Sequence, residues 1–282
     1  MLTVPETFAL ALQRHQAGHL AEAEALYRKI LAAQPDHSGA WHRLSLLAEG
    51  VGRVDLAREL RQHATAFRIS VAHPTCRPDT ALTIRQLWIE RAAQPEQIEY
   101  LFGINEGDIE TVRKLASHPH ALSAGVPVGY SSAVANYNAA VAATHGALVI
   151  CAQDDIYPPP GWDDLIWQRM QPHLHEAKVL HVHDGFSRDQ LMVVMCVTRK
   201  WLERNDGHVL APEYDGYFSD TEFSCRAYAA GEVVDGRDIA FYHDHPFFTR
   251  RANDETYLRQ HNPEAVARGR SIFQRRNPGL NI

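Results

Sequence analysis

The chain has 282 residues, enough to bury a sizeable core in one large domain or in a medium and a small one. Its 45% hydrophobic and 22% charged residues are ordinary for a soluble globular protein. A formal net charge of −6 excludes a general nucleic-acid-binding surface, although residues 247–282 carry seven arginines against three acidic residues. The four cysteines form no CxxC pair, which argues against a zinc site and a disulfide framework and favours reduced thiols.

The order of residues argues against secretion and membrane insertion. The N-terminus lacks the basic start, apolar centre and cleavage site of a signal peptide. No apolar run approaches the roughly 20 residues that span a bilayer. We therefore expect a cytoplasmic protein without a transmembrane segment or a nucleic-acid partner. The arginine-rich C-terminal stretch leaves open a peripheral contact with an anionic membrane or a phosphate group.

The N-terminal part contains an internal repeat with a period of 34 residues. Glycine at a helix–helix turn and alanine where helices cross resemble the tetratricopeptide repeat over residues 4–68, although Arg61 replaces a usual aromatic residue. Because roughly three repeats are needed for independent stability, two should pack on the next domain or another subunit. Docking of a protein partner, self-association and simple capping remain open. The equivalent residues are Leu10, Gly18, Leu20 and Ala23 in the first copy and Leu44, Gly52, Val54 and Ala57 in the second.

From Phe67 onward, short apolar runs alternate with segments of helical periodicity. This alternation is typical of a mostly parallel sheet with helices on both faces, whose ligands bind beyond the carboxyl ends of the strands. We expect residues 1–68 to form helical repeats and residues 69–282 to form this α/β domain. The expected elements are a strand ending at Pro74, a helix capped by Asp79 or Thr80, a strand over 98–104, helices over 109–116 and 131–146, and a central buried strand over 147–153.

Three polar turns follow the predicted strands and fall on one edge of the sheet, at residues 73–78, 105–108 and 153–155. The last contains Asp154 and Asp155. Two carboxylates at the end of a buried strand are costly unless a cation or hydrogen-bond donors offset them. A hard divalent ion that carries a nucleotide diphosphate would do so. An ordinary acidic turn without a ligand is the alternative.

The order and spacing of several motifs resemble a family 2 glycosyltransferase with the nucleotide-sugar-binding GT-A fold, over residues 68–250. The resemblance implies a metal-dependent, inverting transfer of a sugar from a UDP-, GDP- or dTDP-sugar to a hydroxyl of a polysaccharide, glycolipid or protein glycan. Mn²⁺ or Mg²⁺ would be the metal. The motifs are HPTCRP at 73–78, NEGD at 105–108, the helix with Ser131, Ser132, Asn136 and Asn138, QDDIYPPPGW at 153–162 and YFSDTEFSCRAYAAG at 217–231.

The same resemblance implies roles for individual residues. Asp155 would be the main metal-contacting carboxylate, and His243 rather than His245 would complete the metal shell. Gln153 departs from the family at the first acidic position. The nucleotide would be bound by the first two turns and the neighbouring acid, through His73, Thr75, Arg77, Glu106, Asp108 and Asp154.

A downstream helix would supply the general base. Asp220 matches the carboxylate that takes the proton from the acceptor hydroxyl, and Glu222 matches a second acid. Arg226 matches the arginine of this motif, whereas Ser219 departs from its first acid. A simple helix cap at Ser219 or Asp220 is the alternative. Asp184 and Trp162 are secondary candidates for contacts with the acceptor.

Two other classes of protein remain open. A nucleotidyltransferase would also place acids on a metal, but it would normally show a glycine-rich basic loop after the first strand, which HPTCRP lacks. A non-catalytic scaffold would use the helical repeats for binding, on a degenerate transferase domain. The departures at Gln153 and Ser219 keep this reading open.

Overall fold

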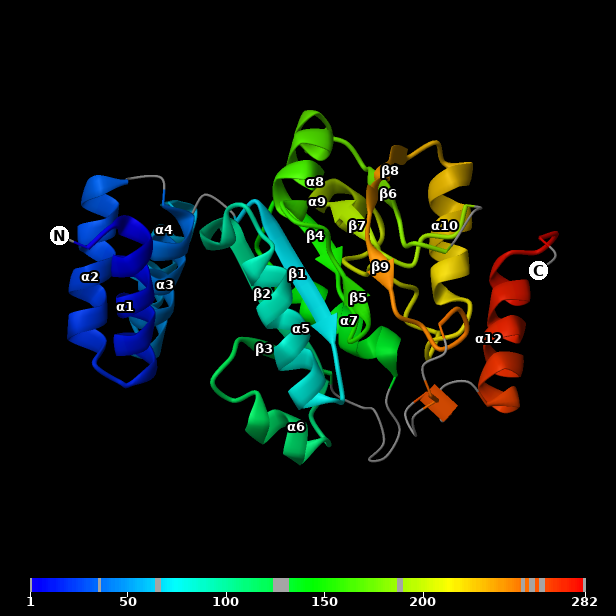
Figure 1. The fold of residues 1–282 in the computed structure, drawn as a ribbon, viewed down its shortest axis with the longest axis horizontal. Helices are drawn as coiled ribbons and strands as arrows, with labels where there is room; N and C mark the ends of the chain where they lie inside the picture. Colours follow the sequence, from blue (N-terminus) through cyan, green and yellow to red (C-terminus); the bar gives the residue numbers. More distant parts are fainter. Residues whose placement is uncertain are drawn as a thin grey trace. The chain divides into compact units, whose positions relative to one another are not determined.

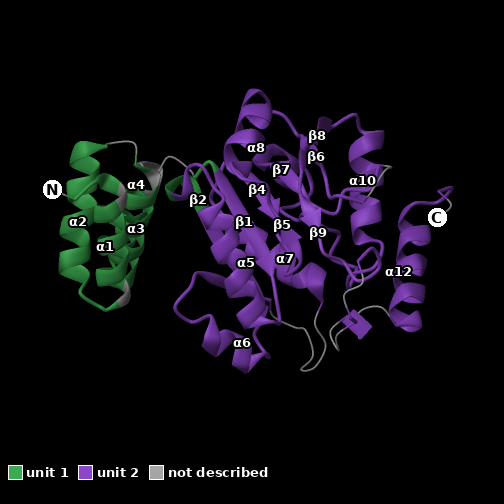
Figure 2. Ribbon diagram, viewed as in Figure 1, with its two compact units in different colours: residues 1–68, 96–98 green, residues 69–95, 99–282 purple. Residues whose placement is uncertain are grey.

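The computed structural model describes residues 2–34, 37–63, 67–123, 132–186, 190–249, 252–253, 257–258 and 262–280. The chain forms two compact units (Figure 2). The first comprises Met1–Arg68 with Glu96–Ile98, and the second comprises Ile69–Pro95 with Glu99–Ile282. No helix among the described residues is both long and apolar enough to cross a membrane.

The first unit contains two antiparallel helix pairs. Each pair is joined by a turn that holds a glycine in the left-handed region, Gly18 at φ +78° and Gly52 at φ +76°, which other residues adopt at a cost. Ala23 and Ala57 are fully buried in this unit. Turn glycine and buried alanine thus both recur after 34 residues. The helices are α1 (Val4–Gln16), α2 (Leu20–Ala33), α3 (Ser38–Gly50) and α4 (Val54–His63) (Figure 1).

A seven-stranded sheet forms the centre of the second unit, in the order β3-β2-β1-β4-β7-β6-β8. The β3–β2, β1–β4 and β6–β8 pairs are parallel, and β7 is antiparallel to both β4 and β6. The predicted mostly parallel sheet is therefore confirmed, with β4 fully buried at its centre. The strands are β1 (Ile69–Pro74), β2 (Ile98–Asn105), β3 (His120–Ser123), β4 (Leu148–Cys151), β6 (Val179–His183), β7 (Cys196–Thr198) and β8 (Val233–Ala240).

Helices and a short ribbon complete this unit. Helix α5 begins at Pro78 after the N-cap Arg77, so the predicted caps at Asp79 or Thr80 are wrong: the fixed φ of proline suits a first helical position, where its missing N–H is not needed. Strands β5 (Ile156–Tyr157) and β9 (Tyr242–His243) pair as a separate antiparallel ribbon. The helices are α5 (Pro78–Glu90), α6 (Ile109–Lys114), α7 (Ala133–Ala142), α8 (Trp162–Met170), α9 (Arg199–Arg204), α10 (Ser219–Ala229) and α12 (Pro263–Arg276), with 3-10 turns at Pro95–Gln97 and Gln171–His173.

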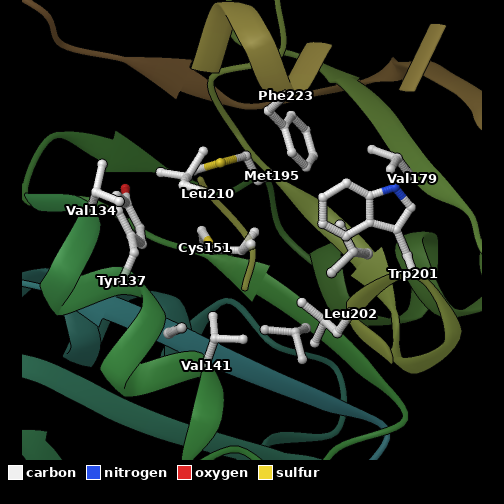
Figure 3. Close-up of a cluster of buried hydrophobic side chains, with 14 of the residues drawn as sticks. Val134, Tyr137, Val141, Cys151, Val179, Met195, Trp201, Leu202, Leu210 and Phe223 are labelled. Carbon is white, nitrogen blue, oxygen red and sulfur yellow. The ribbon is translucent and has the colours of Figure 1, made fainter. Parts of the chain in front are cut away.

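A hydrophobic core joins α7, α9 and α10 to the sheet. Figure 3 shows Tyr137 of α7 beside Cys151 of β4, with Trp201 and Phe223 packed nearby. The rings of Trp201 and Phe223 meet edge to face with centroids 5.1 Å apart. Because Phe223 and Ala227 of α10 are both buried in this core, α10 beyond its first turn is held beside the sheet.

Helix α7 lies unusually close to β2. A Cβ atom on Gly103 would come 2.0 Å from the backbone oxygen of Asn136, so no larger residue fits there without a shift. Ser132 caps α7 by accepting from the backbone N–H of Ala135 at 3.1 Å. Ser131, which the sequence analysis grouped with this helix, lies outside the described residues.

Candidate functional site

The ends of β1 and β4 are joined by a buried hydrogen-bonded chain centred on Asp154. One carboxylate oxygen of Asp154 lies 2.9 Å from Nε2 of His73, and the Thr75 hydroxyl donates to both oxygens at 3.1 and 3.2 Å. Nη1 of Arg77 lies 3.6 Å from the second oxygen. The other His73 nitrogen lies 2.7 Å from the Tyr100 hydroxyl. The charge of Asp154 is thus offset within the protein, as a buried carboxylate requires.

The β5–β9 ribbon brings Asp155 next to His243. In this ribbon Ile156 is paired with His243, and the backbone N–H of Asp244 donates to the carbonyl of Asp155 at 2.8 Å. The backbone N–H of His243 donates to the carbonyl of Asp184 at 3.1 Å, which ties the ribbon to the end of β6. Three acidic or imidazole side chains from three segments therefore meet at this corner.

The imidazole of His243 lies between two carboxylates. Its Nε2 is 3.6 Å from Asp155 and its Nδ1 is 4.0 Å from Asp184, distances too long for direct hydrogen bonds. The residue is only 5% exposed, and neither ring nitrogen forms a hydrogen bond with any residue that the structure describes. Burial alone would lower the pKa of His243, but the facing carboxylates raise it to about 9. The ring centroid of His245 lies 5.0 Å from that of His243, and His245 is half-buried.

The residues at this corner fit a divalent cation. Imidazole nitrogen and carboxylate oxygen are both ligands that Mn²⁺ accepts. A buried imidazole that forms no hydrogen bond with the described residues needs another polar partner, and a metal ion can be that partner. In the described ranges, no three His, Cys, Asp or Glu side chains already converge on one ion position.

Asp220 stands in the first turn of α10, close to the same group of acids. One of its carboxylate oxygens accepts from the backbone N–H of Thr221 at 2.8 Å. Burial raises the pKa of Asp220, whereas hydrogen bonds from Thr221 and the charge of His243 oppose part of this rise. A carboxylate with a raised pKa is a stronger base, which suits proton abstraction.

The buried hydroxyl of Tyr137 is influenced by acids from two segments. Burial raises its pKa well above the usual value, and Cys151 and the charges of Asp155, Asp154 and Asp220 add to the rise. The Tyr137 hydroxyl donates to the carbonyl of Ala152 at 3.2 Å, just before the acidic turn. The acids at the end of β4 and at the start of α10 therefore lie within electrostatic reach of one side chain of α7.

Glu222 is held inside the protein. The residue is 3% exposed. Its carboxylate accepts hydrogen bonds from the Tyr214 hydroxyl at 2.6 Å, from Nε of Arg276 at 2.9 and 3.0 Å and from the Asn277 amide at 3.2 Å. A cavity of about 300 Å³ opens on the face of α10 that carries Ser219, Glu222 and Arg226, and it is also lined by Arg276. Asp220 does not line this cavity.

The turn after β2 places its acids differently. Glu106 is exposed at the tip. Asp108 caps α6 by accepting from the backbone N–H of Thr111 at 3.1 Å, and Asn105 accepts from Gly107 at 2.9 Å. Asp108 therefore has a structural partner, whereas the side chain of Glu106 points into solvent.

Trp162 is fully buried, and its indole N–H donates to the carbonyl of Trp88 at 2.9 Å. No face of this ring is exposed to an acceptor, so we leave Trp162 out of the site. Tyr100 and Tyr137 are not among the residues that the sequence motifs indicate. Each lies in a predicted strand or helix of the α/β domain, where a buried hydroxyl must find a polar partner.

No protein-family profile and no curated protein matches the chain. Among solved structures, it is similar to S. aureus TarS 1–349 in complex with UDP-GlcNAc, with 17% identity, 76% of this chain and 68% of that chain covered, and a TM-score of 0.51. A mannosyltransferase from Pyrobaculum calidifontis in complex with GDP-Man and Mn²⁺ gives 13% identity, coverage of 87% and 88%, and a TM-score of 0.44. The likeness to TarS and the seven-stranded sheet fit the GT-A fold.

A third similar structure is glucosyl-3-phosphoglycerate synthase from Mycobacterium tuberculosis, solved with Mn²⁺, UDP and glucosyl-3-phosphoglycerate. It shares 14% identity with this chain over 78% of this chain and 84% of the other, with a TM-score of 0.49. At 17% identity the likeness to TarS describes a fold, and the chemistry has to be argued from the residues of this chain.

Proposed function

We propose that the chain is a metal-dependent, inverting glycosyltransferase that moves a sugar from a nucleotide-sugar donor to an acceptor hydroxyl. The observation that carries this proposal is the pairing of Asp155 with a buried His243 that forms no hydrogen bond with any described residue, with Asp220 within electrostatic reach of the same imidazole. The shared fold with a protein solved with UDP-GlcNAc supports a nucleotide-sugar donor.

The donor would bind beyond the carboxyl ends of β1, β2 and β4. Arg77 and Glu106 would contact the nucleotide, and Asp154 with His73 and Thr75 would hold the end of β1 in place. Asp155 and His243 would bind Mn²⁺ or Mg²⁺, which would neutralise the diphosphate as the nucleoside diphosphate departs. Because one ligand is an imidazole, Mn²⁺ is favoured.

Asp220 would remove the proton from the acceptor hydroxyl. A base on the side opposite the departing diphosphate allows in-line attack, which inverts the anomeric carbon. Asp184 lies on the far side of the His243 ring and would orient that ring, as partners of metal-bound histidines commonly do. We further propose that the four N-terminal helices are tetratricopeptide-type repeats that bind a partner or cap the protein, and that the protein acts in the cytoplasm.

The proposal is tested by titrating the full chain with UDP, GDP, dTDP and CMP, with and without Mn²⁺, and by following hydrolysis of the matching nucleotide sugars. We expect one nucleotide to raise the melting temperature in a Mn²⁺-dependent way. Asp155→Asn should remove the Mn²⁺ dependence. Asp238→Asn, which changes an exposed aspartate paired with Arg169, is the matched control.

Binding of a nucleotide without any turnover by the wild-type chain would instead favour the non-catalytic scaffold. If no nucleotide sugar binds and Asp155→Asn behaves like the control, the proposed transferase is refuted.

A further inference from the structure

The turn that leads into α10 has a strained backbone. Phe218, the N-cap of α10, has φ +67° and ψ 0°. Among the described residues, Asp206 is the other non-glycine with positive φ. A bulky aromatic residue rarely adopts this conformation unless its surroundings enforce it. Two positions later stands Asp220, so the strain falls directly before the candidate base.

Helix α12 contacts α10, beside which Figure 1 shows it, and Gly269 of α12 lies close to the strained turn. Gly269 of α12 is buried, and a Cβ there would lie 2.5 Å from the backbone oxygen of Tyr217 and 3.1 Å from the ring of Phe218. One turn further along, Phe273 is fully buried with its ring centroid 6.3 Å from that of Phe218. The Arg270 guanidinium lies 5.5 Å from the centre of the Phe218 ring.

A second set of contacts joins α12 to α10 just beyond Asp220. Arg276 donates through Nε to both oxygens of Glu222, and its Nη2 lies 2.9 Å from one of them. Asn277, the C-cap of α12, also donates to Glu222. A planar guanidinium facing a carboxylate fixes orientation as well as distance. Helix α12 therefore contacts Phe218 and Glu222, which lie on either side of Asp220 in the sequence.

The rest of α10 has further anchors outside α12, in a core that also includes Phe273 of α12. Phe223 and Ala227 are buried in the core, and the Ser224 hydroxyl accepts from the backbone N–H of Met192 at 2.9 Å. Loss of the contacts from α12 would consequently release the first turn of α10 before it releases the whole helix. This first turn is the part that carries Asp220.

We propose that α12 is a positioning element for the candidate base: Gly269 and Arg276 hold the segment from Phe218 to Glu222 in the conformation that presents Asp220 to the acceptor. The inference rests on the proposed function for its catalytic consequence, whereas the structural coupling between α12 and the first turn of α10 can be measured without turnover.

The experiment uses the full chain with Arg276→Gln, the conservative Arg276→Lys and the matched control Arg275→Gln, which changes an exposed arginine on the same helix. Gly269→Val is a second, independent perturbation. Displacement of a catalytic group by about 1 Å can cost about 100-fold in rate. We expect Arg276→Gln and Gly269→Val to lower kcat for nucleotide-sugar turnover by about 10- to 100-fold, with donor Kd by calorimetry within about twofold of wild type.

Arg276→Lys should recover part of the rate, and Arg275→Gln should match wild type. Equal losses in kcat and in donor affinity, or an unchanged kcat in Arg276→Gln, would overturn the inference. If Gly269→Val does not fold, Arg276→Gln alone tests the inference.

Hydrogen exchange separates this inference from the proposed function. In Arg276→Gln the amides of residues 219–223 should exchange faster, while those of 225–229 should keep their protection. If this pattern appears in a chain that turns over no nucleotide sugar, the coupling holds and the proposed function fails. If residues 219–223 keep wild-type protection, the coupling is refuted whatever the activity.

Discussion

The buried imidazole of His243 predicts how the stability of the metal-free protein depends on pH. Its pKa is raised from 6.5 to about 9 in the folded state. A group with a raised folded-state pKa contributes stability fully below its unfolded pKa and loses that contribution as the pH rises through the folded value. About 2.5 pKa units at 1.36 kcal/mol each amount to about 3 kcal/mol. The contribution should therefore be present at pH 6 and absent above about pH 9.

Urea denaturation in EDTA, at pH values between 6 and 9.5, measures this contribution. We expect the wild-type chain to lose about 3 kcal/mol more free energy of unfolding over this range than His243→Gln, which cannot titrate. His175→Gln, at an exposed histidine, should follow the wild type. Parallel curves for wild type and His243→Gln would refute the reasoning that Asp155 and Asp184 hold a proton on this ring.

The same proton must leave when a metal binds. A ligand imidazole is neutral, so Mn²⁺ has to displace the proton that His243 carries at neutral pH. Between pH 7 and 8.5 the affinity for Mn²⁺ in the presence of the nucleotide should rise about tenfold per pH unit. Calorimetry in two buffers of different ionisation enthalpy would show release of about one proton. An affinity independent of pH would remove His243 from the metal ligands.

Three further predictions concern neighbouring residues. Asp220→Asn should lower kcat by about 10²- to 10⁴-fold while the donor Kd measured by calorimetry stays unchanged, because a base acts on the acceptor rather than on donor binding; a parallel loss of donor affinity would contradict this role. Asp154→Ala should lower the free energy of unfolding by about 3 kcal/mol in urea, because it leaves His73 and Thr75 without their buried partner; a loss below about 1 kcal/mol would show that the buried chain contributes little. Gly103→Ala should lower the free energy of unfolding by about 1–3 kcal/mol, because its Cβ would clash with the backbone of Asn136. An unchanged urea midpoint would show that α7 can shift without loss of stability.

The elements that could be predicted from the sequence are those that depend on local pattern. The strand 148–151 is apolar, with the polar residues His145 and Gln153 a few positions away on either side, and it is fully buried at the centre of the sheet. The sequence also shows that acidic residues follow this strand. It does not show which carboxylate is already hydrogen-bonded within the protein, because His73 and Thr75, the partners of Asp154, lie about 80 residues earlier in the chain. Nothing in a local pattern distinguishes Asp154 from Asp155.

The environment of α10 shows the same limit. The motif drew attention to Arg226, four residues after Glu222, but Arg226 donates to Asn205 at 2.7 Å and its nearest contact with Glu222 is 3.9 Å. The arginine that binds Glu222 closely is Arg276, which is 54 residues away. The left-handed conformation of Phe218 was equally hidden, since nothing about phenylalanine favours a positive φ. Tertiary packing decides both.

The ribbon of β5 and β9 consists of two residue pairs, and its alternation leaves no margin for insertion or deletion. Tyr242 is 48% exposed and His243 is 5% exposed, because neighbouring residues of a strand face opposite sides. A deletion of one residue between Phe241 and Asp244 would reverse this alternation. Asp155 would then face the phenol of Tyr242, or no side chain of the ribbon at all. Chain length in this segment is therefore constrained more tightly than residue identity, and length variation among related chains should be confined to loops outside it.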